Sequence, residues 1–502
     1  MIPMRLAAVL TAVAVAGAVA LAAAQQAPSH VVASATWWAP GDIRRFDRQV
    51  DYADTTGVVR TLLRDGPMET LGHPFFTALG PNGRACVTCH QPADAMSLSA
   101  ATATARWDAT SGADPVFAAV DGSNCPTLPQ KERASHSLLL DYGLIRIERE
   151  WPPKDAAGKP VKPDFTLEVV RDPNGCNSGQ WGPNGKLKKI SVYRRPRPVS
   201  NLKYLLAMGF AYDPKKGMPL EIDPETGKPS NSNLMADARV YTLEAQARDA
   251  MHTHLGVSTV DNATVRQIVD FALRLSTAQQ VDAKGGRLDV LGGEGGPQKL
   301  ESSQPGQLGS YGVPVWSEFS AWEKIPADAQ LSPAERAYRE SVARGARVFR
   351  DKTFLISDSA GINSPIGFGN PVRNSCVFCH NMSQMGNDVA PGQVDLGTTT
   401  QPFADPAPHL PLFRITCLGE PHPHYGKTIL TNDPGFALTT GRCADVGKIT
   451  LQSLRGLSAR PPYFSNGSAK TLKDVIDYYD RRYSIGYTEQ EKQDLVNLMG
   501  AL

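Results

Sequence analysis

The chain has 502 residues, enough for two or three domains of ordinary size. Its 52 basic and 50 acidic side chains leave a formal charge of +2, which gives no electrostatic case for binding nucleic acid or an anionic membrane surface. Hydrophobic residues make up 41% and charged residues 20%, as in a globular protein. Eight cysteines are too few for a disulfide scaffold of this length.

The amino terminus predicts an export signal. Arg5 precedes an apolar run from residue 6 to residue 24, and three alanines end the run before Gln25. A basic, an apolar and a small-residue region in this order are typical of a cleaved signal peptide, here residues 1–24. An uncleaved membrane anchor is the alternative, because the run approaches the length of a span. The expected mature protein is exported, periplasmic in a bacterium, and not stably inserted in a membrane.

Two short motifs carry the strongest chemical signal. Each has the form C-x-x-C-H, the spacing at which two thiols bond to haem vinyl groups and the adjacent histidine ligates the iron. The motif residues are Cys86, Cys89 and His90 in the first half of the chain and Cys376, Cys379 and His380 in the second half. Zinc would need further regularly spaced thiols or imidazoles, and a thioredoxin-like site would need a βαβ pattern. The sequence shows neither pattern around these motifs. We therefore expect two covalently bound c-type haems.

The other four cysteines follow the haem motifs in pairs. In an oxidising compartment the simplest local pairing predicts the disulfides Cys125–Cys176 and Cys417–Cys443. Sequence alone does not prove this connectivity.

The expected fold is mostly α, with two c-type cytochrome-like haem domains. Residues 107–234 are rich in Pro, Gly and Lys and weakly periodic, so they predict a loop-rich insertion in the first half, with short strands near residues 165–170 and 190–193. Residues 284–312 are rich in glycine, which predicts a linker or an ordered crossing loop. The expected parts are an amino-terminal haem domain at 25–283, a linker at 284–330 and a carboxy-terminal haem domain at 331–502.

Apolar periodicity predicts helices outside the insertion. The first starts at Thr242 and ends near Gly256, with His254 on the same face as Leu243. The apolar stripe of a second helix comprises Val265, Ile268, Val269, Ala272 and Leu275. Three later helices are expected from Pro333 to Phe349, after the capping-box-like Thr471, and after Thr488.

Two further segments match a family pattern. Residues 237–247 contain D-A-R and L-E-A-Q-A, and residues 454–472 contain L-R-G, P-Y-F-S-N-G-S and T-L. Together with the haem motifs they resemble the bacterial di-haem cytochrome c peroxidase superfamily, which includes the MauG-type enzymes. The resemblance covers about half of the chain and leaves out residues 107–234.

The resemblance implies a six-coordinate carboxy-terminal haem that passes electrons and an amino-terminal haem at which peroxide reacts. In the family, the distal ligand of the carboxy-terminal haem is Met in peroxidases and Tyr in MauG-type members. The corresponding position is Tyr479, whose phenolate would lower the reduction potential. The alternative is that Tyr479 is a core residue with a hydrogen-bonded hydroxyl. Tyr478 lies off the apolar stripe. Rival ligands are Met382, Met385, His409, His422 and His424.

The chain departs from the family at the peroxide site. The distal Gln corresponds to Gln246, but the Glu expected ten residues later is Gly256. Imidazole can take and return a proton of peroxide, so we expect His254 to be the acid–base residue, with a bland surface or capping role as the alternative. His252 points roughly the opposite way. The tryptophan that lies between the haems in the family falls on Ala236.

The predicted function is reduction of hydrogen peroxide at the amino-terminal haem. Electrons would come from a small donor protein, such as a cytochrome c or a cupredoxin, and pass through the carboxy-terminal haem. One alternative is a MauG-like or rubber-oxygenase-like enzyme that oxidises an organic or protein substrate with peroxide or dioxygen. Another is a non-enzymatic electron-transfer cytochrome in which both irons are capped, for instance by His73 or His136 on the first haem. Related proteins hold calcium between their domains, which makes Ca²⁺ a further candidate cofactor.

Overall fold

The computed structural model describes residues 37–154, 158–207, 211–213, 218–220, 233–304, 317–363, 368–380 and 393–502. The predicted signal peptide lies outside these residues, as do the rival ligands Met382 and Met385. In the described part of the chain, no helix is long and apolar enough to cross a membrane.

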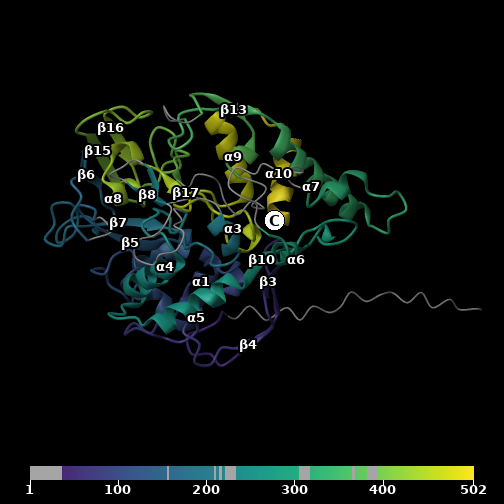
Figure 1. Ribbon diagram of the computed structural model, residues 1–502, viewed down its shortest axis with the longest axis horizontal. Helices are drawn as coiled ribbons and strands as arrows, with labels where there is room; N and C mark the ends of the chain where they lie inside the picture. Colours follow the sequence, from purple (N-terminus) through teal and green to yellow (C-terminus); the bar gives the residue numbers. More distant parts are fainter. Residues whose placement is uncertain are drawn as a thin grey trace, which may run out of the picture. The chain divides into compact units, whose positions relative to one another are not determined.

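The helices begin and end close to where the sequence places them (Figure 1). A π-helix at Met251–Leu255 continues α4 to the left-handed Gly256. The α-helices are α1 Ala100–Thr110, α2 Ser137–Tyr142, α3 Leu202–Ala207, α4 Leu243–Ala250, α5 Asn262–Leu273, α6 Pro297–Ser302, α7 Pro333–Asp351, α8 Ala437–Thr440, α9 Leu472–Tyr483 and α10 Glu489–Ala501.

Side-chain caps explain these starting points. Thr242 accepts a hydrogen bond from a backbone N–H of the first turn of α4, and Asp261 does the same for α5. Full capping boxes start α7 at Ser332, α9 at Thr471 and α10 at Thr488. The five predicted helices are therefore confirmed.

One residue of the predicted stripe is wrong. Leu275 is not part of α5, because that helix ends at Leu273 and strand β10 begins at Leu275, which pairs with Leu63 of β3. A buried leucine fits both the last turn of a helix and the first residue of a strand, and Leu275 is buried. Helical periodicity alone therefore could not distinguish the two assignments.

Strands form seven small sheets in the described residues, so a mostly helical fold is not clearly supported. The largest has the order β11-β10-β3-β2 and the next β16-β15-β6; the others pair β1 with β4, β5 with β7, β8 with β9, β12 with β13 and β14 with β17. The strands are β1 Arg45–Phe46, β2 Gln49–Ala53, β3 Gly57–Leu63, β4 Met68–Glu69, β5 Ile145–Glu150, β6 Phe165–Arg171, β7 Lys189–Arg194, β8 Ala211–Asp213, β9 Met218–Leu220, β10 Leu275–Asp282, β11 Gly286–Arg287, β12 Phe354–Ile356, β13 Val372–Asn374, β14 Gln393–Val394, β15 Leu412–Cys417, β16 Thr428–Thr431 and β17 Ile449–Thr450.

The predicted insertion is built into the core. Its two expected strands are present as β6 and β7. Strand β6 pairs antiparallel with β15 of the second half, with Leu167 opposite Ile415, and both side chains are buried. One hydrophobic cluster therefore joins residues from both halves of the sequence.

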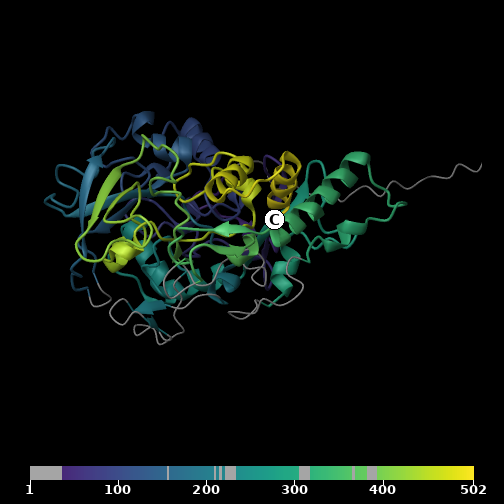
Figure 2. The same ribbon diagram turned by 90° about the horizontal axis from the view of Figure 1, so that it is seen from above.

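The carboxy-terminal helices pack closely. Helix α10 lies against α7, as both views show (Figure 2). Gly345 makes this contact possible, because a Cβ there would lie 2.2 Å from the carbonyl oxygen of Asp494. In the predicted linker, Trp322 is fully buried beside Val342 of α7, so this part of the segment packs into the core.

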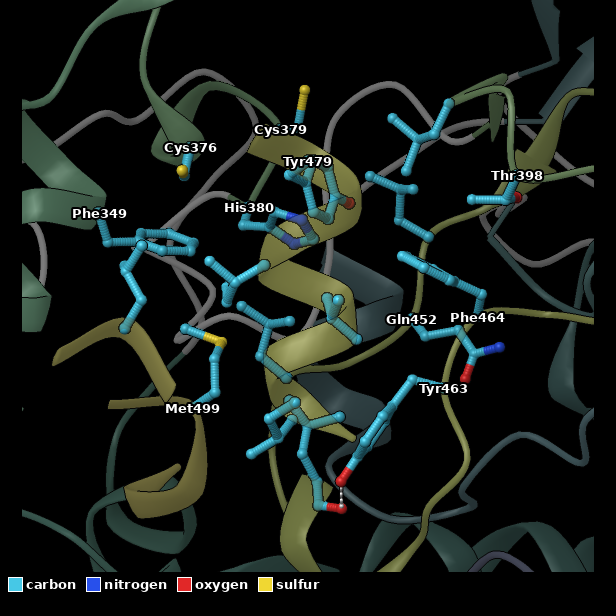
Figure 3. Close-up of a pocket in the computed structure, with 18 of the residues that line it drawn as sticks. Phe349, Cys376, Cys379, His380, Thr398, Gln452, Tyr463, Phe464, Tyr479 and Met499 are labelled. Carbon is cyan, nitrogen blue, oxygen red and sulfur yellow. Dashed lines mark hydrogen bonds between the residues drawn. The ribbon is translucent and has the colours of Figure 1, made fainter. Parts of the chain in front are cut away.

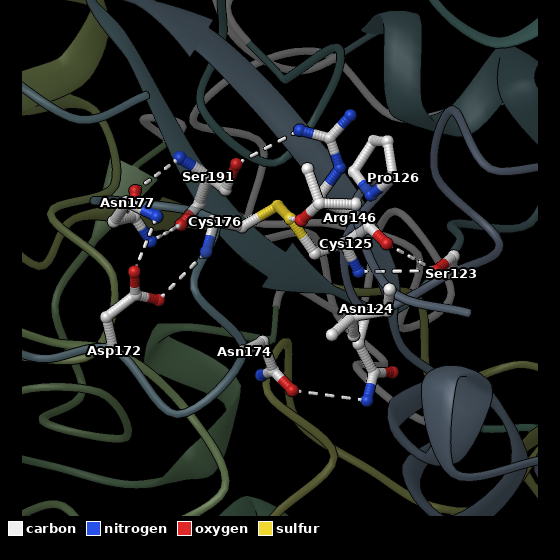
Figure 4. The surroundings of a disulfide bond; sticks show 12 residues. Ser123, Asn124, Cys125, Pro126, Arg146, Asp172, Asn174, Cys176, Asn177 and Ser191 are labelled. Atoms are coloured by element: carbon white, nitrogen blue, oxygen red, sulfur yellow. Dashed lines mark hydrogen bonds between the residues drawn. A yellow bond between two sulfur atoms is a disulfide. The ribbon is translucent and has the colours of Figure 1, made fainter. Parts of the chain in front are cut away.

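Both predicted disulfides are confirmed. Cys125 pairs with Cys176, and Cys417 pairs with Cys443. Asp172 accepts hydrogen bonds from the backbone N–H groups of Cys176 and Asn177 and fixes the turn beside the first disulfide (Figure 4).

Candidate haem pockets

The first C-x-x-C-H motif forms a tight turn. Residues Cys86–Thr88 make a 3-10 helix, and the backbone N–H of His90 donates to the carbonyl of Cys86. The fully buried Arg106 donates a hydrogen bond to the carbonyl oxygen of Thr88 at 2.6 Å and so stabilises the turn. The turn brings both thiols and the imidazole to one side of a pocket.

The imidazole of His90 is oriented as a metal ligand. Its Nδ1 lies 3.1 Å from the carbonyl oxygen of Met96, which can accept a hydrogen bond from that nitrogen. Nε2 is then left to face the pocket with its lone pair, the usual arrangement of an iron-ligating histidine. Burial lowers the pKa of His90 to about 4, so the ring is neutral at neutral pH.

Gln246 and His254 line the same pocket as His90. Gln246 comes from α4 and His254 from the π-helix that continues it. The rest of the lining is mainly apolar and includes Phe75, Ile145, Val199, Leu243, Met251 and Ile268.

A buried carboxylate holds His254 in place. Nδ1 of His254 lies 2.5 Å from Oδ2 of Asp121, and Asp121 also forms an ion pair with the buried Arg84. Burial alone would raise the pKa of the Asp121 carboxyl, but Arg84 and His254 together hold it below its usual value. Asp121 is therefore ionised and accepts a hydrogen bond from Nδ1–H, which leaves the lone pair of His254 on Nε2.

Asp121 escaped the sequence analysis because it lies 133 residues from His254 and belongs to no motif. His252 behaves differently from His254. It is exposed, its Nδ1 contacts the carbonyl oxygen of Val257, and it is not part of the pocket lining.

The second motif repeats the turn. Residues Cys376–Phe378 form a 3-10 helix, and the N–H of His380 donates to the carbonyl of Cys376 at 3.0 Å. Both cysteines and His380 line a separate pocket, grouped at one end of it beside Tyr479 (Figure 3). Burial lowers the pKa of His380 to about 4, so this imidazole is neutral as well.

Tyr479 lines the pocket of His380, as the apolar stripe of its helix requires. Burial raises the pKa of its hydroxyl well above the ordinary value, so the side chain is a neutral phenol without a metal. Tyr478 points elsewhere and donates to the carbonyl of Leu396 at 2.9 Å. Met499 of α10 also lines the pocket and is a rival ligand that the sequence analysis missed.

The other rival histidines lie away from the pockets. Among the described residues, neither lining includes His73, His136, His409, His422 or His424. Both ring nitrogens of His136 face carbonyl oxygens, those of Gly122 and Gln130, so His136 has a structural role where it stands.

The two pockets share a wall. Ala236 lines the pocket of His90 and Thr450 that of His380, and the N–H of Thr450 donates to the carbonyl of Ala236 at 2.9 Å. The position that holds tryptophan in the resembled family thus carries no aromatic ring here but a direct backbone contact between the pockets.

The donor set of each pocket fits a c-type haem. The four motif cysteines are free thiols, and burial raises the pKa of Cys86 to about 12 and of Cys379 to about 12. A mainly apolar cavity with two thiols and a neutral imidazole suits thioether attachment and iron ligation. In the described residues, no group of three or more His, Cys, Asp or Glu side chains forms a metal site, so calcium stays a prediction without a located site.

Part of the chain is similar in sequence to known proteins. Three curated relatives are named cytochrome-c peroxidase. IdrP1 of Pseudomonas sp. strain SCT is 28% identical over 214 residues, 39% of this chain and 48% of the relative. IdrP1 of Denitromonas iodatirespirans is 28% identical over 197 residues, and IdrP2 of the same organism 24% over 220 residues.

The chain spans about half the length of these cytochrome-c peroxidases, with 48%, 50% and 56% covered. The similarity supports a place near the cytochrome c peroxidases and leaves MauG-type membership open. No protein-family model matches the chain, and no solved structure matches it with significance.

Proposed function

We propose that the protein is an exported di-haem peroxidase that reduces hydrogen peroxide in the pocket of His90. The electrons come from a small donor protein, such as a cytochrome c or a cupredoxin, by way of the pocket of His380. One observation carries the proposal: Gln246 and an imidazole held by a buried carboxylate line the pocket of His90. The names of the relatives agree with it.

The chain's own residues would hold two haems. Cys86 and Cys89 attach one and His90 ligates it, while the second motif and His380 do the same for the other. Haem iron supplies peroxide binding and electron exchange. The apolar lining excludes bulk water, and the shared wall at Ala236 and Thr450 keeps the path between the pockets short.

His254 moves the proton. Its Nε2 accepts a proton from one oxygen of peroxide and returns it to the other oxygen, which leaves as water. Asp121 stabilises the imidazolium formed between these steps and keeps the proton on Nδ1. The amide of Gln246, which lines the same pocket, binds peroxide. The overall reaction consumes two electrons and two protons for each peroxide and yields two waters.

A second candidate function rests on Tyr479. A tyrosine in this pocket is the family feature of MauG-type enzymes, which oxidise a substrate other than a small donor protein. Oxidation of an organic or protein substrate is therefore the alternative reaction of the same irons. The two confirmed disulfides support export to an oxidising compartment for either function.

The deciding experiment measures stoichiometry. The purified holoprotein is mixed with peroxide and a reduced one-electron cytochrome c, and loss of both is followed. We expect two donor molecules oxidised for each peroxide consumed, together with a high-spin ferric EPR signal from the haem of His90. Peroxide loss without donor oxidation would favour the second function, and two low-spin irons that refuse cyanide would contradict both.

A further inference from the structure

The segment Arg194–Val199 runs along the wall between the two pockets. Its residues line the pocket of His90. Arg197 donates to the carbonyls of Thr450 and Leu451, at 3.1 and 2.7 Å, and these two residues line the pocket of His380. One extended segment therefore contacts the linings of both pockets.

Two other guanidinium groups meet at this wall. Arg195 lines the pocket of His90, and Arg460 lines the pocket of His380. Arg195 donates through Nη2 to the carbonyl oxygen of Arg460 at 3.0 Å and through Nη1 to the carbonyl oxygen of Pro462. Arg460 donates to the carbonyls of Ser453 and Arg455.

Neither guanidinium forms a hydrogen bond or an ion pair with a carboxylate among the described residues, although the buried Asp94 acts electrostatically on Arg195. Arg195 is 5% and Arg460 3% exposed, and all their hydrogen bonds go to neutral carbonyl oxygens. The Nε–H of each is buried without an acceptor. The adjacent Arg194 shows the contrast, because Asp433 and Asp237 neutralise it with bonds of 2.6 to 2.9 Å.

Buried cations without anions are costly, and proteins pair them. Burial lowers the pKa of Arg195 to about 9 and that of Arg460 to about 10; the charge of Arg460 adds to the effect on Arg195, and the charge of Arg197 adds to the effect on Arg460. The structure thus presents to each pocket, at the wall that separates them, one buried guanidinium that no carboxylate of the described residues binds directly.

Haem chemistry provides the anions. The vinyl groups that bond to cysteines lie on one edge of the porphyrin, and the two propionate carboxylates lie on the other edge. In the pocket of His380, Cys376 and Cys379 lie at one end and Tyr463 at the opposite end (Figure 3). Arg460 lines the same pocket and acts electrostatically on the hydroxyl of Tyr463. A haem attached to these cysteines extends its propionates away from them.

We propose that Arg195 and Arg460 bind the propionate carboxylates of the two haems, one guanidinium for each haem, so that both propionate edges meet at the shared wall. The proposal rests on haem attachment in the proposed function and is independent of peroxide turnover. It assigns to these residues control of the two reduction potentials, because a cation beside a haem favours the reduced, less positive iron.

The test is a spectroelectrochemical titration of the holoprotein, with each haem assigned by its own EPR signal. For Arg460→Gln we expect the haem of His380 to become harder to reduce, with at least a tenfold lower ratio of reduced to oxidised haem at the wild-type midpoint, about 59 mV. Arg195→Gln should do the same to the haem of His90. Each variant should also change the propionate bending band in the resonance Raman spectrum.

Arg339→Gln is the matched control. Arg339 is 2% exposed, its Nε and Nη1 lack hydrogen-bond partners, and it lines neither pocket. The substitution should leave both reduction potentials and the propionate Raman band unchanged. Arg460→Lys, which keeps the charge, should restore most of the potential and covers the case in which the Gln variant folds poorly.

The outcomes separate the two proposals. Unchanged potentials and Raman bands in folded Gln variants that carry two haems per chain would overturn the propionate assignment alone. An equal shift in Arg339→Gln would overturn it as well. A chain that binds no haem at all would instead contradict the proposed function.

Discussion

The pocket of His90 and the pocket of His380 start from the same motif and end with different chemistry. In both, a 3-10 turn brings two thiols and a neutral imidazole to one side of an apolar cavity. The first cavity has Gln246 and His254 in its lining, with Asp121 bonded to His254, whereas the second has Tyr479 and Met499. The motif thus predicts the same cofactor for both pockets, and we expect the other elements that line each pocket to decide what its iron can do.

The largest expected effect separates the pockets by proton transfer. His254→Ala should lower kcat/KM for peroxide by roughly 10²- to 10⁴-fold, the usual contribution of a general acid–base group. Stopped-flow measurement of peroxide reduction checks it. His252→Ala is the control from the same π-helix and should leave the rate unchanged, since His252 is exposed and lines neither pocket. Equal rates for His254→Ala and wild type would remove His254 from the mechanism.

The disulfides test whether the His90 side depends more on covalent support. Replacing Cys125 and Cys176 by serine should lower the free energy of unfolding by about 4 kcal/mol, since the loop closed has a sequence separation of 51. Cys417 and Cys443 close a separation of 26, for which about 3.5 kcal/mol is expected. Denaturant titration gives both values.

The first pair lies close in sequence to Asp121. Its removal should therefore slow peroxide reduction more than removal of the second pair, which belongs to the hydrophobic cluster against which Cys89 packs. If both double variants slow the reaction equally, the disulfides do not distinguish the two pockets.

Tyr479→Phe sharpens the other side of the comparison. If Tyr479 ligates the iron beside His380, the low-spin EPR signal of that haem should change and its potential should rise, because a phenolate favours oxidised iron. Tyr478→Phe is the matched control and should lose only its hydrogen bond to Leu396, about 1 kcal/mol of stability. An unchanged signal in Tyr479→Phe would exclude Tyr479 as the ligand and make Met499 the next candidate.

The smallest effect concerns His73, the rival cap of the first haem. Burial lowers its pKa to about 4, so as the pH falls below 6.5 the unfolded chain binds a proton that the folded chain rejects. The free energy of unfolding should therefore decrease from pH 6.5 to about pH 4, and His73→Gln should weaken this dependence. The variant should keep the wild-type EPR spectrum. A new high-spin signal would instead show that His73 capped an iron.

Part of the site followed from short-range chemistry. The haem motifs and the capping residues Thr242, Thr471 and Thr488 act within a few positions of the chain, so local sequence was enough to predict them. The disulfides also followed, because four cysteines in two neighbouring pairs leave one simple local pairing. Helical periodicity placed Tyr479 and His254 on pocket-facing sides of their helices.

Long-range contacts decided the rest. Asp121 reaches His254 across 133 residues, Arg195 reaches Arg460 across 265, and β6 of the first half pairs with β15 of the second. No local pattern records such pairings, because hydrogen bonds and buried charges depend on where the folded chain brings its segments together. The sequence by itself therefore determined which cofactor to expect and where it would attach. Only the tertiary structure determined which side chains share each pocket and how thin the wall between them is.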